Sequence, residues 1–180
     1  MTKRPPMPIV QLEEIPYLQG RQLQFESVAQ MLTVRSNETP DAPHVYYYDR
    51  KLTYKDTNDR ANKVANFLKK AGIQKRDIVA VMIVNSPENY YAMWGAQKLG
   101  AIALAMNCSL KGKEIAYVLN DAKPKIVFVG SELMTEFNKG VEFANSEPFV
   151  VEVVTEVKHD STLARAKLTD IMAEYPSEEC

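Results

Sequence analysis

The residues best suited to do chemistry lie in two short polar turns, each directly after an apolar run typical of a β-strand. Residues 85–87 (Asn-Ser-Pro) follow the run 78–84, and residues 107–109 (Asn-Cys-Ser) follow the run 101–106. Ligands favour the carboxyl ends of parallel strands, and the free N–H groups at a helix start can hold an anion. The first turn is therefore either an anion site or a plain helix cap.

Cys108 is a second candidate, because a thiol at a helix start can act as a nucleophile when the helix dipole lowers its pKa. The alternative is a small, half-buried side chain with a packing role. The other cysteine is Cys180, and two cysteines so far apart predict no disulfide framework and a reducing compartment. His44 and His159 have no Cys or His neighbour, so the sequence offers no metal-ligand spacing.

Six aromatic residues form a third candidate set: Tyr46, Tyr47, Tyr48, Tyr90, Tyr91 and Trp94. Such a set can stack on nucleic-acid bases. Packing in a core and a hairpin is the alternative, and it is favoured because no basic patch accompanies the rings. The formal net charge of −1 gives no general attraction to nucleic acid or to an anionic membrane, so no nucleic-acid partner is predicted.

The composition is that of a soluble globular protein, with 46% hydrophobic and 25% charged residues. The longest apolar stretch, residues 92–106, is interrupted by Gln97-Lys98 and is shorter than the roughly 20 residues that a membrane-spanning helix needs. We therefore expect no transmembrane segment. A cytoplasmic location is predicted, with peripheral attachment to a membrane as an alternative.

The elements that must position these turns begin with a hairpin and a capped helix. The hairpin is expected over residues 45–53, with Asp49-Arg50 as its turn. Thr53 is expected to cap the next helix, with Asp56 as the capping acid and Gly72 as the stop. Further helices are expected to start at Ser86, at Ser109 or Leu110, and at Ser131, and a last one to cover residues 161–174 with Leu163, Leu168, Ile171 and Met172 inward.

Strands are expected over residues 78–84, 101–106, 125–129 and 149–154, between these helices. Continuous apolar runs suit strands that are covered on both faces. The alternation predicts an α/β fold with a doubly wound, mainly parallel sheet flanked by helices. Residues 1–24 are expected to form an extended arm, and residues 25–180 an α/β subdomain.

Several ordered motifs make the chain resemble the adenylate-forming superfamily, in its acyl-CoA synthetase branch. They are Leu52-Thr53-Tyr54-Lys55-Asp56, Arg60-Ala61-Asn62, Asp77-Ile78-Val79 with Asn85-Ser86-Pro87-Glu88, Trp94-Gly95-Ala96 with Gly100 and Asn107, and Asn120-Asp121-Ala122-Lys123-Pro124. The resemblance covers about residues 25–129. Two positions depart from the usual pattern: Arg76 replaces a glycine, and Ala105-Met106 replaces a proline-containing turn. The second departure resembles fatty-acid-transport-protein-type long- and very-long-chain acyl-CoA synthetases.

The resemblance implies the N-terminal subdomain of a ligase that uses ATP, Mg and CoA to convert a carboxylic acid, fatty or otherwise apolar, to acyl-CoA, AMP and pyrophosphate. It implies no catalytic residue and no metal ligand in these 180 residues. CoA contacts are carried over to Asn107, Cys108, Ser109 and Lys139. In the family, the phosphate loop, the Mg-binding acid and the lysine-bearing lid domain lie downstream, so the chain alone is expected to be inactive and to bind none of these cofactors tightly.

Other interpretations stay open at this point. The chain could be a stand-alone, non-catalytic α/β binding module, or a subunit that completes its site with a second chain. It could also belong to another adenylate-forming enzyme, such as an aryl-, bile- or carnitine-type CoA ligase. A truncated parallel sheet would expose an apolar edge, so self-association is a further prediction.

Overall fold

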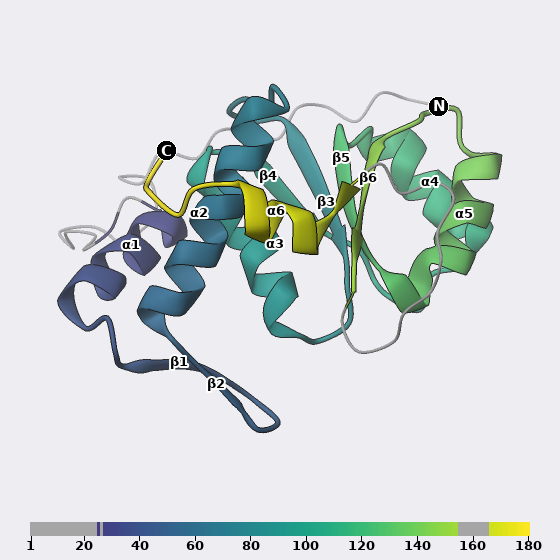
Figure 1. Ribbon diagram of the computed structural model, residues 1–180. Helices are drawn as coiled ribbons and strands as arrows, with labels where there is room; N and C mark the ends of the chain where they lie inside the picture. The colour runs from purple at the N-terminus through teal and green to yellow at the C-terminus, as the bar shows by residue number, and fades with distance from the viewer. Residues whose placement is uncertain (1–24, 26, 155–165) are drawn as a thin grey trace, which may run out of the picture.

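The computed structural model describes residues 25, 27–154 and 166–180, and its centre is a five-stranded parallel sheet (Figure 1). The strands stand in the order β4-β3-β5-β6-β7. Their bounds are β3 Ile78–Met82, β4 Ile102–Ala105, β5 Ile126–Gly130, β6 Phe149–Val153 and β7 Ala166–Lys167. All four pairings are parallel. The predicted arm over residues 1–24 lies outside the described residues.

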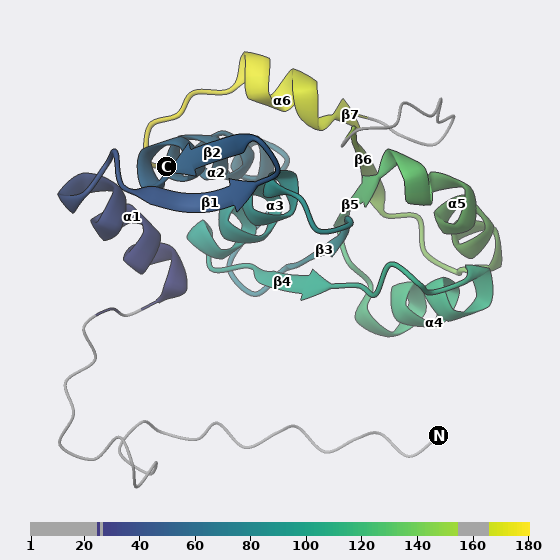
Figure 2. The same cartoon turned by 90° about the horizontal axis from the view of Figure 1, so that it is seen from below.

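Helices cover both faces of this sheet, which confirms the doubly wound prediction. One face carries α2 (Tyr54–Lys70), α3 (Pro87–Lys98) and α6 (Leu168–Glu174), and the other carries α4 (Gly112–Ala122) and α5 (Met134–Phe143) (Figures 1 and 2). Helix α1 (Val28–Glu38) packs beside α2 and α3. Strand β3 shows why the sheet needs both layers: Val79 and Val81 enter one core, whereas Ala80 and Met82 enter the other.

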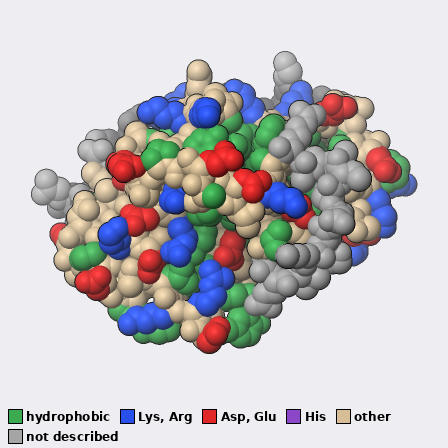
Figure 3. Space-filling view, in the orientation of Figure 1, with side chains coloured by type: hydrophobic (Ala, Val, Ile, Leu, Met, Phe, Trp, Pro, Cys, Tyr) green, Lys and Arg blue, Asp and Glu red, His purple; other side chains and the backbone are tan. Residues whose placement is uncertain are grey.

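Strand β4 forms one edge of the described sheet, and its residues are only partly covered. Ile102 is 50% exposed. An apolar edge strand can pair with another chain, so self-association through this edge stays a prediction. On the face seen in Figure 3, basic and acidic side chains are interspersed rather than gathered by sign.

The predicted hairpin is confirmed as β1 (Pro43–Tyr47) and β2 (Arg50–Thr53), but its turn lies one residue earlier than expected. Arg50 pairs with Tyr47 in the ladder, so Tyr48 and Asp49 form the turn. Tyr48 adopts the left-handed conformation, with φ of 49°, that a two-residue hairpin turn commonly requires. Arg50 also donates from Nη2 to Glu88 Oε1 at 3.1 Å, which ties the hairpin to the start of α3.

Helix α2 begins with the predicted capping box. The Asp56 backbone N–H donates to Thr53 Oγ1, and the Thr53 backbone N–H donates to Asp56 Oδ2, both at 3.0 Å. At the other end, Gly72 takes a φ of 82°, which lets the chain leave the helix. The helix that displays Arg60, Asn62 and Lys63 to its neighbours is therefore fixed at both ends by local sequence.

Replacing Asp56 by asparagine is expected to lower the free energy of unfolding at pH 7 by about 0.5–1 kcal/mol. The pKa of Asp56 is lowered, chiefly by the hydrogen bond from the Thr53 backbone. A lowered folded-state pKa stabilises the protein above the unfolded value near pH 4, and this stabilisation is lost as the pH falls through the folded value. Urea unfolding across this pH range should show that the difference in the free energy of unfolding between wild type and variant becomes smaller in acid. A difference that persists in acid would contradict the assignment; Asp121→Asn, at an exposed site on α4, is the control.

Three predicted helix starts differ from the structure. Helix α4 begins at Gly112, not at Ser109 or Leu110, because Asn107 Oδ1 accepts from the Ser109 backbone N–H at 2.9 Å and holds the chain in a turn. The Ser131 hydroxyl does not cap: it donates to Glu152 Oε1 at 2.9 Å, and a short 3-10 helix, η3 (Ser131–Leu133), precedes α5. The described part of the predicted last helix starts only at Leu168, after β7, and Leu163 lies outside the described residues.

Candidate functional site

The strand order places a topological switch point at the carboxyl ends of β3 and β5. These strands are neighbours, yet the chain leaves β3 through α3 toward β4 and leaves β5 through α5 toward β6, on opposite faces of the sheet. Ligands of doubly wound proteins bind at such points. Both predicted turns, residues 85–87 and 107–109, follow strands at this end of the sheet.

The predicted turn at residues 107–109 is open to solvent. Asn107 and Ser109 are exposed, and Cys108 is half-buried. The Asn107 side chain fixes the turn through its bond to the Ser109 backbone, so its amide group is already partly engaged. The turn can present backbone and hydroxyl groups to a ligand, but it is a rim and not a closed site.

The reactive-thiol interpretation of Cys108 is wrong in this fold. The helix that should activate the thiol starts at Gly112, so Cys108 does not lie at its first turn. Burial and the nearby negative charge of Glu132 raise the pKa of the Cys108 thiol. The thiolate, which is the nucleophile, is therefore less populated than in a free cysteine.

Alkylation by iodoacetamide at pH 8 should accordingly modify the exposed Cys180 at least about tenfold faster than Cys108. Mass spectrometry of the two peptides after short exposure measures both rates in one sample. In a Cys180→Ser background, Glu132→Gln should accelerate labelling of Cys108, because the negative charge that helps to raise its pKa is gone. Equal rates at the two cysteines in the folded chain would refute the assignment.

Lys139 lies on α5 and faces the start of α4 rather than the turn itself. Gly112 permits this approach: a Cβ there would lie 3.1 Å from the Lys139 Cβ. Lys139 Nζ donates to Glu136 Oε1 at 2.6 Å. That hydrogen bond, the charges of Lys139 and Lys111, and the Gly112 backbone N–H lower the pKa of Glu136, although partial desolvation opposes them. The structure thus brings Lys139 together with Lys111 and Gly112, and contacts of residues 107–109 and Lys139 with CoA stay a prediction.

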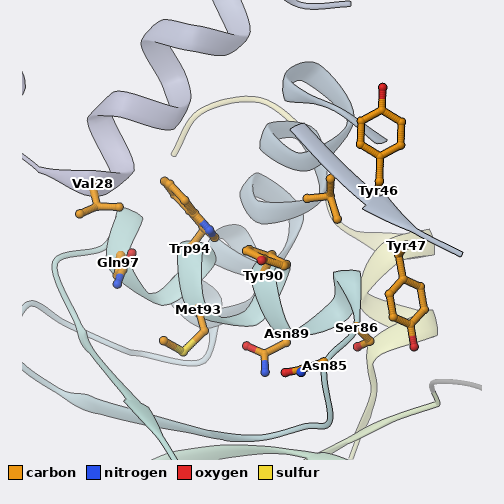
Figure 4. Close-up of a pocket in the computed structure, with 11 residues that line it drawn as sticks. Val28, Tyr46, Tyr47, Asn85, Ser86, Asn89, Tyr90, Met93, Trp94 and Gln97 are labelled. Atoms are coloured by element: carbon orange, nitrogen blue, oxygen red, sulfur yellow. The ribbon is translucent and has the colours of Figure 1, made fainter. Parts of the chain in front are cut away.

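A cavity of about 580 Å³ lies between the hairpin, α1 and α3 (Figure 4). It collects four of the six aromatic residues singled out from the sequence: Tyr46, Tyr47, Tyr90 and Trp94. Asn85 and Ser86 come from the first predicted turn, residues 85–87. The lining residues that sequence reasoning did not single out as candidates are Val28, Val45, Asn89, Met93 and Gln97. The helical spacing of Tyr90, Met93, Trp94 and Gln97 would have shown that they share one face of α3.

Ser86 at the base of this cavity departs from the ordinary behaviour of a helix cap. It occupies the N-cap position of α3, yet its side chain makes no capping hydrogen bond. Its hydroxyl is buried and has no hydrogen-bond partner among the described residues, and Ser86 as a whole is 4% exposed. A capping bond is worth about 1 kcal/mol, so the local sequence forgoes stability at this position.

His44, to which the sequence assigned no role, has clear partners. Its ring stacks on Tyr54 with centroids 4.5 Å apart, and Nδ1 lies 3.1 Å from Thr57 Oγ1. Burial lowers the pKa of His44, so the neutral ring is favoured at neutral pH. Within the described residues, this histidine is a packing group that joins the hairpin to α2.

Within residues 25, 27–154 and 166–180, no group of three or more His, Cys, Asp or Glu side chains could hold a metal ion. In the same part of the chain, every helix is too short or too polar to cross a bilayer.

Comparison with protein families matches the AMP-binding enzyme family to residues 32–178. The parallel sheet and its carboxyl-end turns therefore define the N-terminal fold of an adenylate-forming enzyme. This chain belongs to the AMP-binding enzyme family.

Curated relatives include both a fatty-acid–CoA ligase and synthases of another kind. The long-chain-fatty-acid–CoA ligase FadD13 of Mycobacterium tuberculosis is 39% identical over 83 residues, which is 46% of this chain and 16% of the ligase. Tyrocidine synthase 1 of Brevibacillus parabrevis is 31% identical over 113 residues, or 63% of this chain and 10% of the synthase. The chain spans between 1% and 16% of the lengths of the curated relatives compared.

Solved structures share the fold. An anthranilate CoA ligase, AuaEII, in complex with anthranoyl-AMP superposes with a TM-score of 0.76 at 23% identity, over 87% of this chain and 30% of the ligase. A fatty acyl CoA synthetase of Mycobacterium tuberculosis gives a TM-score of 0.66 at 26% identity, over 84% of this chain and 29% of that one. The N-terminal domain of FACL13 from the same organism gives 0.69 at 24% identity, over 87% of this chain and 37% of that domain.

Proposed function

We propose that this chain is the N-terminal subdomain of an AMP-forming acyl-CoA synthetase. The observation that carries the proposal is the 39% identity over 83 residues to a long-chain-fatty-acid–CoA ligase. The parent enzyme would join a carboxylate to ATP, forming an acyl-adenylate and releasing pyrophosphate. The thiol of CoA would then displace AMP to give acyl-CoA.

The role of the described residues in this proposal is to build a scaffold and one rim of a site. Asn107, Cys108, Ser109 and Lys139 would lie near CoA, with Cys108 as a neutral, half-buried group. Residues 25–180 would form one subdomain, and the groups that stabilise charge on the transferring phosphorus would come from elsewhere in the enzyme. The parent would work in the cytoplasm, with peripheral attachment to a membrane as the alternative.

A fatty or other apolar acid is the substrate class that we propose. FadD13 is named for long-chain fatty acids, and the proline-free Ala105-Met106 turn agrees with that choice. A second candidate has a specific observation behind it: the peptide synthetases that match this chain, including tyrocidine synthase 1, would favour an amino acid as the acid that is adenylated.

The test compares the 180-residue chain with the protein made from the complete reading frame of its gene. With ATP, Mg and a panel of fatty acids, aromatic acids and amino acids, the complete protein should release pyrophosphate and, with CoA, form acyl-CoA that mass spectrometry detects. The chain alone should release none. Pyrophosphate release with amino acids only would favour the peptide-synthetase interpretation.

Two outcomes would overturn the proposal. One is release of pyrophosphate by the 180-residue chain itself, because the chain would then contain a complete site. The other is failure of the complete, folded protein with every acid in the panel, which would favour a binding module without turnover.

A further inference from the structure

The cavity between the hairpin, α1 and α3 is separate from the turn at residues 107–109 that the family resemblance marks. Its lining comes from the hairpin, α1, α3 and the loop before α3, whereas that turn follows the edge strand β4. We propose that this cavity binds an uncharged aromatic ring that carries a hydrogen-bonding edge, such as a heterocyclic base.

The walls of the cavity suit a flat ring. Tyr90 and Trp94 lie one turn apart on α3, Met93 lies between them in sequence, and Tyr47 comes from the hairpin (Figure 4). Tyr46 points away from the other side chains and is 71% exposed, so it is not counted as a wall. The volume of about 580 Å³ falls in the range of small-molecule sites, and aromatic walls bind flat rings by stacking.

Three polar lining residues, Asn85, Ser86 and Asn89, lie together at one end of the cavity and could bind the edge of such a ring, whereas Gln97 lies at the other end (Figure 4). Asn85 and Asn89 flank the base of the cavity in Figure 4, next to Ser86. Asn89 Nδ2 donates to the Ile83 carbonyl oxygen at 3.0 Å, which orients this amide and leaves its oxygen as an acceptor. The buried Ser86 hydroxyl has no partner among the described residues. Amide and hydroxyl groups are the side chains that read donor and acceptor patterns on base edges.

The charge of the lining selects against ionic ligands. Of the eleven lining residues within the described part of the chain, none is Lys, Arg, Asp or Glu. A phosphate or carboxylate in the cavity would lose hydration and gain no cationic side chain from these residues, so the N-terminus of α3 would have to offset that loss. A neutral ring therefore fits better than a nucleotide or a free acid, and this separates the cavity from the carboxylate substrate of the proposed ligase.

The chain contains its own reporter for this site, because Trp94 is its single tryptophan. Adenosine is the probe, ribose is the control without a ring, and AMP is the charged comparator. Titration of the 180-residue chain, excited at the red edge of tryptophan absorption, should show saturable quenching with adenosine, weaker binding of AMP and no saturable change with ribose.

Two variants test the polar edge. Ser86→Ala and Asn89→Leu should each weaken adenosine binding by about 3- to 10-fold, the cost of one lost hydrogen bond. Tyr117→Ser, at a 68% exposed site on α4, is the matched control and should bind as wild type. Circular dichroism checks that each variant folds, and saturation-transfer NMR on adenosine gives a second readout independent of Trp94.

Three results would overturn the proposal: no saturable response to adenosine in either readout, the same response to ribose, or unchanged affinity in both folded edge variants. None of these depends on pyrophosphate release, so this proposal can fail while the ligase proposal stands, and the reverse.

Discussion

Replacing Gly95 by alanine is expected to lower the free energy of unfolding by about 2 kcal/mol, even though alanine is the better helix former. A Cβ at this position would lie 2.6 Å from Val64 Cγ1, 2.7 Å from Val64 Cβ and 3.0 Å from the Ala61 carbonyl oxygen. These atoms belong to the backbone and to a β-branched side chain of α2, so none can swing aside. Helices α2 and α3 would have to separate.

Urea unfolding monitored by circular dichroism measures this effect, and Gly112→Ala is the matched control. Gly112 also sits where two helices meet, but the nearest atom to its missing Cβ is 3.1 Å away, so a small adjustment suffices. Combining Gly95→Ala with Val64→Ala should lower the free energy of unfolding by less than the sum of the two single losses, because the contact with Val64 Cγ1 is gone although the Cβ stays in place. A Gly95→Ala variant as stable as wild type would show that the helices pack less closely than described.

Glu179→Ala is the second change with a large expected effect. It should lower the free energy of unfolding by about 2 kcal/mol, because it leaves a buried ammonium group without its ion-pair partner. The Lys98 side chain is only 2% exposed, and its Nζ donates to Thr33 Oγ1 at 2.8 Å and to Glu179 Oε1 at 2.9 Å. Glu179 is 52% exposed, so its own desolvation is small, and most of the cost falls on the lysine.

A double-mutant cycle isolates that cost. Lys98→Met keeps the volume of the stem without the charge, and Lys98→Met with Glu179→Ala should be more stable than the sum of the two single losses indicates. The last residues should stay docked in all variants, because Asn62 and Asn66 donate to backbone oxygens of residues 176–178. Additive losses in the thermal midpoints would show that the ion pair does not couple these sites.

Local sequence predicts those parts of the fold whose causes are local. The apolar runs at residues 78–84 and 125–129 mark β3 and β5, because central parallel strands are buried on both faces. The Thr53–Asp56 capping box spans only four residues, so the local sequence contains everything needed to predict it.

The predictions that differ from the structure failed because of contacts between distant parts of the chain or because of side-chain hydrogen bonds. Ser131 resembles a helix cap, but its hydroxyl bonds to Glu152, which comes from β6 and is buried beside it only in the folded sheet. Helix α4 starts later than predicted because the Asn107 side chain competes with the helix for backbone N–H groups. Likewise, the sequence marked the tyrosines and Trp94, but Val28 and the hairpin reach α3 only through tertiary packing.

The pairing of β3 with β5 also has a kinetic consequence. Helix α3, strand β4 and helix α4 all lie between these two strands in the sequence, so the central pair of the sheet closes a long loop. Closing the loop costs chain entropy before the contacts between the two strands can form and offset that cost. Folds dominated by such pairings form in milliseconds to seconds. The nascent chain therefore exposes its most apolar segments until Lys125 and the strand after it emerge, and this interval is when the protein is most open to aggregation.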